Sequence, residues 1–388
     1  MNLRQEINYE LNNHIIPFWK NLRDVENGGF YGRANYDLNI IKESDKGCIL
    51  NSRILWFFSM AYATTGQTEL LDYASHSYNF MNRAFVDKEN YGLYWSVSYD
   101  GKCLDDTKHT YCQAFAIYAL SAYYRVSGDK SALEAAMVLF NLIESKCSDA
   151  LGYGEAFDKN WNIIVNDKLS ENGVIADKTM NTLLHIYEAY TGLYAVTKSP
   201  IVKDKMLKIL DIFTSNVYNP ELHRLEVFFD KEYRSIINLY SYGHDIEASW
   251  LIDYGLDILD DADIKSKYTW LADVLVTQTF NSGFTGNSML LENENGMDDT
   301  SRVWWVQCEA IIGFVNAFHK NPKNRHYLDA AEKIWGYVKN YIIDSRPGGE
   351  WFWEVNENGH PESKRDICDP WKCPYHNGRM CFEILRRI

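Results

Sequence analysis

The sequence predicts an all-α fold in which six helical hairpins close into two concentric rings, an (α/α)6 barrel. One unit recurs about six times, with a period of roughly 60 to 70 residues: an amphipathic helix, a long aromatic loop, an apolar helix and a short turn. Helical pairs at a fixed period form a solenoid or a closed toroid. One helix of each pair is far more apolar than its partner, which favours an inner and an outer ring over an open solenoid. No linker or low-complexity tract interrupts the chain, so we expect residues 1–388 to form a single domain.

The amphipathic helices, which we expect in the outer ring, follow from apolar residues at helical spacing. In the first helix, Leu3, Ile7, Leu11, Ile15 and Phe18 form one apolar stripe. The same periodicity predicts the outer helices over residues 3–21, 68–84, 131–146, 201–216, 263–280 and 325–342.

The apolar helices should be buried on all sides and therefore form the inner ring. They are predicted over residues 49–65, 109–126, 178–197, 244–260, 302–319 and 375–387. Glycine-containing turns at Gly66 and Gly128 end the first two.

The long loops before the inner helices are rich in glycine and aromatic residues. Their strand-like alternation predicts short β-hairpins, with candidate segments at 27–32, 91–96, 151–155, 223–229 and 348–353. Short turns then gather at one rim of the barrel and long loops at the other, where the inner helices begin. Loops and element ends on a rigid scaffold carry function, so we expect the functional groups at the long-loop rim.

Composition excludes several classes of protein. The net charge is −14 and no basic run occurs, so nucleic acid is not an expected partner. We expect no signal peptide and no bilayer-spanning segment, hence no membrane partner. The eight cysteines show no paired framework, which predicts reduced thiols and a cytoplasmic location. The supply of 12 Trp, 27 Tyr and 18 Phe suits ligands with flat apolar faces, such as sugars.

Two histidines stand near the starts of apolar helices. On a helix beginning near Gly243, His244 and Glu247 share one face, so the carboxylate can orient the ring and raise its basicity. His376 has a similar place in the last helix. Half a metal site is the alternative for His-x-x-Glu, but no matching ligand set is evident, and we expect no metal.

All six inner helices bring polar groups into an apolar ring, which is costly unless the groups serve a purpose. Each residue also has a structural interpretation. His185 is a candidate hydrogen-bonded core residue, Arg53 an ion-pair partner, Asn181 a cap, and Tyr111 a core aromatic, as are the adjacent tryptophans. The polar and aromatic residues at the helix starts are Asn51, Ser52, Arg53, Lys108, His109, Tyr111, Gln113, Lys178, Asn181, His185, His244, Asp245, Glu247, Arg302, Trp304, Trp305, Glu309, His376, Asn377 and Arg379.

The sequence has no phosphate-binding loop and no dinucleotide-binding fingerprint. A site made of several histidines and an arginine is suited to epimerisation at a carbon next to a carbonyl. Histidines on opposite sides of a carbon can take a proton from one face and return it to the other. The enediolate formed between these steps needs a fixed positive charge, which Arg53 can supply. Two rivals stay open. A glycoside hydrolase would use two carboxylates from Asp245, Glu247 and Glu309, and a sugar-binding protein would need only the aromatics.

Six segments resemble those of the cellobiose 2-epimerases, a group within the N-acylglucosamine 2-epimerase superfamily. They are LNSRILW at 50–56, LSENG at 169–173, KTMNTLLH at 178–185, SYGHDIEASW at 241–250, the tryptophans 304–305, and WKCPYHNGRMC at 371–381. The resemblance covers essentially the whole chain. It implies the (α/α)6 barrel, no required metal or cofactor, and conversion of reducing-end glucose to mannose in β-1,4-linked disaccharides such as cellobiose and lactose.

The resemblance also implies roles for individual residues. His244 and His376 match the acid/base pair, Arg53 the enediolate stabiliser, His185 a third histidine that assists the opened sugar, and Glu247 the carboxylate that tunes the first histidine. Substrate contacts are expected from Tyr111, Asn181, Trp304, Trp305, Trp371 and Glu309. N-acylglucosamine and free mannose remain alternative substrates. We further expect a monomer or weak homodimer and a place in mannan degradation.

Overall fold

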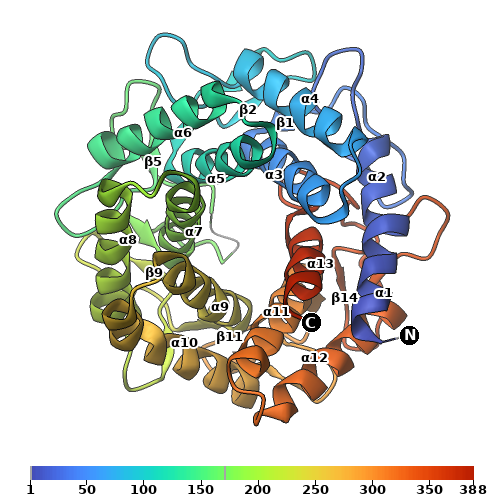
Figure 1. Ribbon diagram of the computed structural model, residues 1–388, viewed down its shortest axis with the longest axis vertical. Coiled ribbons are helices and arrows are strands. Elements are labelled where there is room, and N and C mark those ends of the chain that lie inside the picture. Colours follow the sequence, from blue (N-terminus) through green and yellow to red (C-terminus); the bar gives the residue numbers. More distant parts are fainter. Residues whose placement is uncertain (1, 170–171) are drawn as a thin grey trace.

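The computed structural model describes residues 2–169 and 172–388 and confirms the (α/α)6 barrel. Figure 1 shows two concentric rings of helices around a central space. The inner ring consists of α3 (Cys48–Thr65), α5 (Thr110–Ser127), α7 (Met180–Thr197), α9 (Tyr242–Leu259), α11 (Trp304–Lys320) and α13 (Tyr375–Arg387). Each inner helix packs on the next, and α13 packs back on α3, so the ring closes.

The outer ring begins with α1 (Leu3–Glu10), the π-helical turn η1 (Leu11–Ile15) and α2 (Ile16–Asn21), which follow one another without a break. Its other members are α4 (Glu69–Ala84), α6 (Lys130–Leu142) with η2 (Ile143–Cys147), α8 (Pro200–Ile212) with η3 (Phe213–Val217), α10 (Ala262–Gly283), and α12 (Arg325–Tyr337) with η4 (Val338–Ile342). Helix α1 packs against α13, which brings both termini to one rim (Figure 1).

The short turns after α3, α5, α7 and α9 are built around a residue with left-handed backbone, whereas Asn321 after α11 is extended (φ −139°). Gly66 (φ 70°) and Gly128 (φ 72°) cap α3 and α5, where a glycine carries no Cβ penalty. Lys198 (φ 51°) and Asp260 (φ 51°) take the same position after α7 and α9. The turn geometry therefore recurs even where glycine does not.

Short strands join neighbouring units at the opposite rim, as expected for the long loops. The strand just before an inner helix pairs antiparallel with a strand in the next long loop. These pairs are β1 (Lys46–Gly47) with β2 (Ser96–Val97), β4 (Lys108–His109) with β5 (Ala156–Phe157), β6 (Lys178–Thr179) with β9 (Phe228–Phe229), β10 (Leu239–Ser241) with β11 (Glu292–Glu294), and β13 (Arg302–Val303) with β14 (Glu354–Val355). A bridge between Ala34 and Cys368 joins the first loop to the last.

The remaining strands extend these pairs or form a hairpin of their own. Strand β3 (Cys103–Asp105) adds to β2, β12 (Met297–Asp298) adds to β11, and β7 (Tyr218–Asn219) pairs with β8 (Arg224–Leu225). The segment 223–229, read from sequence as one strand, is two strands with different partners, β8 and β9.

A lysine–carboxylate pair fastens the start of several inner helices to the loop that follows the preceding outer helix. Lys46 Nζ lies 2.7 Å from Asp24 Oδ2, and both side chains are fully buried. The same arrangement joins Lys108 to Asp87 at 2.8 Å. Lys372 and Glu350 form another fully buried pair, and Lys178 pairs with Asp149, whose side chain is half exposed. Each lysine precedes its inner helix by two or three residues, so the pairs fix where the helices enter the rim.

Replacing Lys46 by Met should destabilise the protein by about 3 to 5 kcal/mol, because Asp24 would remain as a buried, uncompensated charge. Chemical unfolding of both proteins measures the difference. The matched control is Lys20→Met, whose partner Glu69 is half exposed and whose loss should cost no more than about 1 kcal/mol. Equal effects for the two lysines would contradict this account of the buried pairs.

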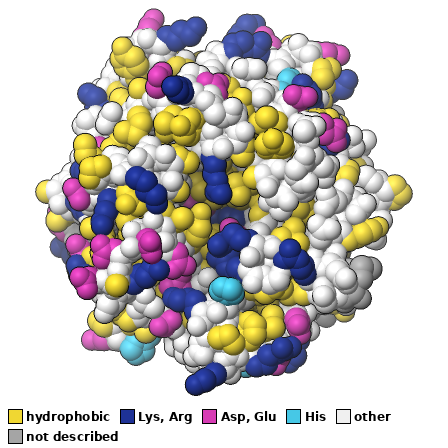
Figure 2. All heavy atoms as spheres, in the orientation of Figure 1, with side chains coloured by type: hydrophobic (Ala, Val, Ile, Leu, Met, Phe, Trp, Pro, Cys, Tyr) yellow, Lys and Arg dark blue, Asp and Glu magenta, His cyan; other side chains and the backbone are white. Residues whose placement is uncertain are grey.

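The face that carries the short turns and both termini is rich in cations near its centre (Figure 2). A hollow of about 500 Å³ there is lined in part by Arg4, Arg125 and Arg386. Within residues 2–169 and 172–388, no helix is both long enough and apolar enough to cross a bilayer.

Candidate active site

A cavity of about 460 Å³ opens at the long-loop rim, where the inner helices begin. The structure brings together there every residue proposed for the site except Glu309. Those that line the cavity are Arg53, Tyr111, Asn181, His185, His244, Glu247, Trp304, Trp305, Trp371 and His376. The volume suits a small ligand such as a disaccharide.

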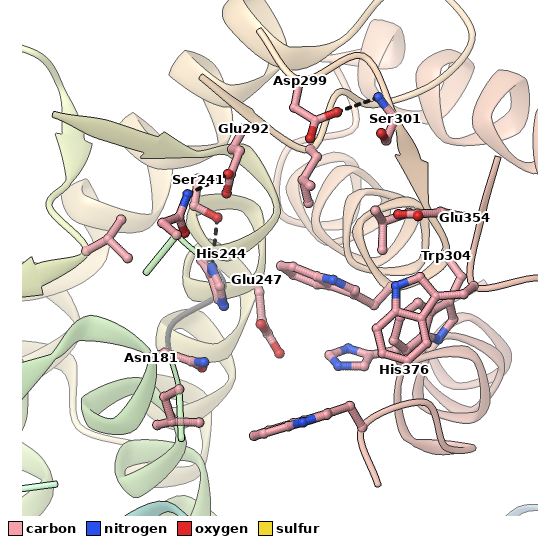
Figure 3. A pocket seen from close by; sticks show the side chains of 18 of the residues that line it. Asn181, Ser241, His244, Glu247, Glu292, Asp299, Ser301, Trp304, Glu354 and His376 are labelled. Carbon is pink, nitrogen blue, oxygen red and sulfur yellow. Dashed lines mark hydrogen bonds between the residues drawn. The ribbon is translucent and has the colours of Figure 1, made fainter. Parts of the chain in front are cut away.

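His244 lies in the first turn of α9 and faces the cavity (Figure 3). Its Nδ1 is 2.7 Å from Ser241 Oγ, the residue that caps the helix. The Trp305 ring packs against it with a centroid distance of 4.8 Å. Burial, and then the charge of His185, lower the pKa of His244 to about 3, so the ring is neutral near pH 7. A hydroxyl partner can donate to Nδ1 or accept from it, so either ring tautomer is allowed.

His376 lies across the cavity from His244, at the start of α13 (Figure 3). Its Nδ1 is 2.7 Å from Glu309 Oε1. A carboxylate only accepts, so Nδ1 carries the proton and Nε2 presents a lone pair. Burial is the largest cause that lowers the pKa of His376, followed by the charge of Arg379. The ring is therefore a neutral base.

His185 comes from α7, and its Nδ1 is 2.9 Å from Glu188 Oε2. Burial opposes ionisation of Glu188, but Arg379 and His185 outweigh it and lower the pKa of Glu188 to about 2. The Tyr111 ring meets the His185 ring edge-on at 5.1 Å. The expectation that His185 is a hydrogen-bonded core residue therefore agrees with its contact with Glu188. His185 also lines the cavity.

Arg53 on α3 is 3% exposed and has no carboxylate partner among the ion pairs of the described residues. Its Nη2 donates to Tyr111 Oη at 3.0 Å, and Nη1 lies 3.4 Å from the carbonyl oxygen of Trp371. The guanidinium packs over the rings of Phe115 (4.2 Å) and Tyr375 (4.6 Å). Arg53 therefore brings an unneutralised positive charge to the cavity wall.

Glu247 differs from the sequence-based expectation. The carboxylate that should orient His244 is hydrogen-bonded to Arg379 Nη2, and Ser241 supplies the partner of His244 Nδ1. Burial, and next the charge of Glu309, raise the pKa of Glu247 to about 7. The physical reason is competition, because a buried guanidinium is a stronger partner for a carboxylate than a neutral imidazole.

Glu309 also requires correction. The sequence predicts a substrate contact for Glu309, but its side chain is fully buried and does not line the cavity. Its oxygens accept hydrogen bonds from Trp250 Nε1 at 2.9 Å and from Arg379 Nη2 at 2.7 Å, besides the contact with His376. Glu309 is the carboxylate that orients a site histidine, the role expected of Glu247.

The aromatic residues of the wall surround the histidines. Trp305 lies against both rings, 4.8 Å from His244 and 5.5 Å from His376. Trp304 is more buried and packs on Trp353 at 4.8 Å. Trp305 is therefore the tryptophan of the pair with the larger accessible face toward a ligand, and Trp371 and Tyr111 complete the wall.

Asn181, considered as a helix cap, also lines the cavity, near His244 (Figure 3). Thr179 caps α7 instead, accepting from the backbone N–H of Thr182. The Asn181 Oδ1 atom is buried and has no hydrogen-bond partner among the described residues, so it is an unpaired acceptor in a residue of the cavity wall.

The outer part of the cavity is lined by polar residues of the long loops. They are Lys168, Asn172, Glu292, Asp299, Ser301, Glu354 and Arg365. Asn172 Nδ2 donates to Glu292 Oε1 at 3.1 Å and to Glu294 Oε2 at 3.2 Å, joining two loops across the rim. Ser170 and Glu171, in the middle of the 169–173 segment, lie outside the described residues.

Three residues of the site were missed in the sequence. Glu188 follows His185 at the same i,i+3 spacing that singled out His244 and Glu247, so that pattern was available as a signal. Ser241 precedes His244 by three residues and could have been considered as its partner. Arg379 is recognisable as a polar residue at a helix start, but its contacts with three carboxylates depend on residues from other helices.

Glu247, Glu309 and His376 have ligating atoms within 4.8 Å of one another, a grouping that can hold a metal ion. However, Arg379 Nη2 is hydrogen-bonded to an oxygen of each carboxylate. A cation of the protein already fills the position between them. A metal ion would have to displace a fully buried guanidinium, so these residues do not fit a metal site.

The arrangement supports proton transfer on two sides of one ligand. Neutral imidazoles of His244 and His376 face a shared cavity, and Arg53 supplies a positive charge for a developing anion. The carboxylates of Glu188, Glu247 and Glu309 are hydrogen-bonded to the buried Arg379, and those of Glu188 and Glu309 also to histidines, instead of facing each other across a bond.

Comparisons with known proteins agree with this chemistry. A model of the N-acylglucosamine 2-epimerase family matches residues 29–377. The cellobiose 2-epimerase of Ruminococcus albus is 47% identical over 383 residues, which cover 98% of this chain and 98% of that protein. The solved structure of cellobiose 2-epimerase from Bacillus thermoamylovorans B4167 is 46% identical, with a TM-score of 0.95 over 99% of both chains. A D-mannose isomerase, at 18% identity, matches with a TM-score of 0.86 over 99% of this chain and 98% of that one and shows the fold alone. The chain therefore belongs to the N-acylglucosamine 2-epimerase family.

Proposed function

We propose that this protein is a cellobiose 2-epimerase, an isomerase that interconverts glucose and mannose at the reducing end of β-1,4-linked disaccharides. Cellobiose is the expected substrate, with lactose and cello-oligosaccharides as related ones. The proposal rests on the neutral imidazoles of His244 and His376, which face one cavity beside the unneutralised guanidinium of Arg53. The relatives named above, which match over nearly their whole length, support the choice of substrate.

The reaction begins with the sugar ring opened, so that C2 lies next to the C1 carbonyl. One imidazole takes the proton from C2, and the electron pair of the C–H bond forms an enediolate whose charge is stabilised by Arg53. The opposite imidazole, which is neutral in the free protein, takes up a proton from water and delivers it to the other face of C2, and the first imidazole then releases its proton to water. The Nε2 lone pair of His376 suits the accepting role in one direction, and the roles exchange in the reverse direction.

The remaining wall residues hold and open the sugar. His185, oriented by Glu188, assists the opened form of the sugar. Trp305, Trp371 and Tyr111 offer flat faces for sugar rings, and Asn181 Oδ1 is a free acceptor for a hydroxyl. Glu309 acts through His376.

The rival hydrolase would need two carboxylates on either side of a glycosidic bond. Glu247 and Glu309 are both hydrogen-bonded to Arg379. Asp245 is fully buried and accepts from the backbone N–H of Leu225, away from the cavity lining. These positions argue against hydrolysis. N-acylglucosamine epimerisation and mannose isomerisation remain outcomes that the experiment below can reveal.

The cellular setting belongs to the same proposal. The eight free cysteines support a reducing, cytoplasmic location, and the net charge of −14 argues against nucleic acid. The contact of Arg379 with both carboxylates supports a reaction without a metal or other cofactor. We further propose that residues 1–388 act as a single catalytic domain, in a monomer or weak homodimer, with no membrane partner and a role in mannan degradation.

The proposal is tested by incubating the protein with cellobiose in heavy water and recording proton NMR spectra. The expected result is a new mannose-type reducing end with deuterium at C2. Free glucose would instead identify a hydrolase. An unchanged disaccharide would exclude cellobiose, and the same experiment with N-acetylglucosamine and with mannose would then identify the substrate.

A further inference from the structure

Arg379 is a buried cation that the proposed chemistry does not use. It stands on α13, three residues after His376, and is 1% exposed. It does not line the cavity, so it cannot touch the substrate. Its side chain packs over the rings of Tyr375 (4.1 Å) and Trp250 (4.8 Å). Such complete burial of a guanidinium requires several hydrogen-bonded partners.

Arg379 is hydrogen-bonded to three carboxylates from three different inner helices and to the Tyr375 hydroxyl on its own helix. Nη1 donates to Glu188 Oε1 at 2.6 Å, and Nη2 donates to Glu247 Oε1 and, at 2.7 Å, to Glu309 Oε1. Glu188 and Glu309 each hold the Nδ1 atom of a site histidine, and Glu247 lines the cavity. One guanidinium is therefore hydrogen-bonded to both carboxylates that hold a site histidine and to Glu247 in the cavity wall.

The contact with Glu309 has a particular geometry. The same oxygen, Oε1, accepts from Arg379 Nη2 and from His376 Nδ1, each at 2.7 Å. A buried carboxylate with no other cation would stabilise the imidazolium form of its histidine, as the aspartate of a catalytic triad does. A histidine that is already protonated cannot accept a proton from C2. The guanidinium shares the charge of this oxygen and so weakens its hold on the imidazole proton.

We propose that Arg379 is a positioning residue whose guanidinium neutralises Glu309 and thereby keeps His376 in its neutral, proton-accepting form. The inference rests on the proposed epimerase function for its catalytic meaning, but the state of His376 can be measured without any substrate. It goes beyond the assignment of the two histidines, because it explains why one of them is a base in the free protein.

Several charged groups besides Arg379 lie near His376. The charge of Arg379 is the largest electrostatic cause that lowers the pKa of His376, after burial itself. Lys372 lies 5.2 Å from the Trp304 ring, which packs on His376, and is paired with Glu350. The charged and titratable groups that face His376 are Arg53 from α3, His185 from α7, His244 and Glu247 from α9, Glu309 from α11, and Tyr375 and Arg379 from α13.

The test replaces Arg379 by Gln, which removes the charge and keeps a hydrogen-bonding side chain. We expect kcat near pH 7 to fall by about 100-fold and the acidic limb of the kcat/KM profile to move up by about 1 to 3 pH units. Activity should then recover in part at alkaline pH. In the ligand-free protein, ¹⁵N NMR should show the His376 titration shifted upward by a similar amount. Arg379→Lys, which keeps the charge, should keep the titration near its wild-type position.

Two further variants keep the test decisive. Arg387→Lys is the matched control, because Arg387 lies on the same helix and over the same Trp250 ring but pairs with Glu383, far from the cavity lining; it should leave the profile unchanged. If Arg379→Gln does not fold, the double variant Arg379→Gln/Glu188→Gln restores the net charge of the buried cluster and should show the same upward shift.

A loss of activity that is equal at every pH, with an unchanged His376 titration, would overturn the proposal and make Arg379 purely structural. If the wild-type protein fails to exchange the C2 proton of cellobiose, the proposed function fails, while the NMR titration still decides the role of Arg379.

Discussion

Replacing His376 by Asn should lower kcat for cellobiose epimerisation by about 10² to 10⁴, and His244→Asn should do the same. Asparagine keeps a polar side chain of similar size but cannot carry a proton between carbon and water. His376 is held by Glu309 and His244 by Ser241, so each substitution removes the proton carrier and leaves the opposite histidine with its own partner. Both variants should fold, which circular dichroism and thermal unfolding can check.

Proton exchange gives a sharper result than overall rate. If the histidines serve opposite faces of C2, each variant should still exchange deuterium into one epimer without inverting it. The variant that exchanges the C2 proton of cellobiose for deuterium should not exchange that of the mannose-ended epimer. The other variant should exchange only the mannose-ended epimer. The control is His319→Asn, an exposed histidine near the far end of α11, which should behave as wild type. Full activity in either site variant would refute the pair, and loss of exchange with the same epimer in both would refute the division of faces.

Most of the fold could be predicted from the sequence because the helices differ strongly in periodicity and apolar content. Helix α13 occupies its predicted range, and α3 begins one residue before its predicted start. The strands were harder to place, since a pair of two residues leaves little pattern. The segment 223–229 reads as one strand, yet β8 and β9 pair with different partners, β7 and β6, which only the folded loops determine.

The members of the site could be predicted more readily than their connections. Residue type and position at helix starts identify His244, His376 and Arg53, because polar groups in an apolar ring are conspicuous. Spacing alone could not decide which carboxylate serves which histidine. His185 and Glu188 pair at i,i+3, whereas Glu247, at the same spacing from His244, is bonded to Arg379, which is 132 residues away. That choice depends on the position of α13 beside α9 and α11, which closure of the ring fixes.

Replacing Arg53 by Met should lower kcat/KM by about 10² to 10³, with most of the loss in kcat. The enediolate charge develops only on the way to the intermediate, so a cation that stabilises this charge acts mainly on the transition state. Arg53 suits this role because its charge is not neutralised by a carboxylate among the described residues and aromatic rings hold it in place. Arg53→Lys should recover only part of the activity, since an ammonium lacks the planar fork that contacts both Tyr111 and Trp371.

The unfolding temperature of Arg53→Met distinguishes a catalytic role of Arg53 from a structural role. The Arg53 Nε atom is buried without a hydrogen-bond partner, and no described carboxylate loses an ion-pair partner when Arg53 is removed. Arg53→Met should therefore unfold at the same temperature as wild type or higher, while its activity is lost. The control is Arg125→Met at the exposed short-turn face, which should alter neither property. A clear drop in the unfolding temperature, or a loss of activity smaller than about 10-fold, would contradict the assignment of Arg53 as the enediolate stabiliser, since the charge effect calls for a larger loss without destabilisation.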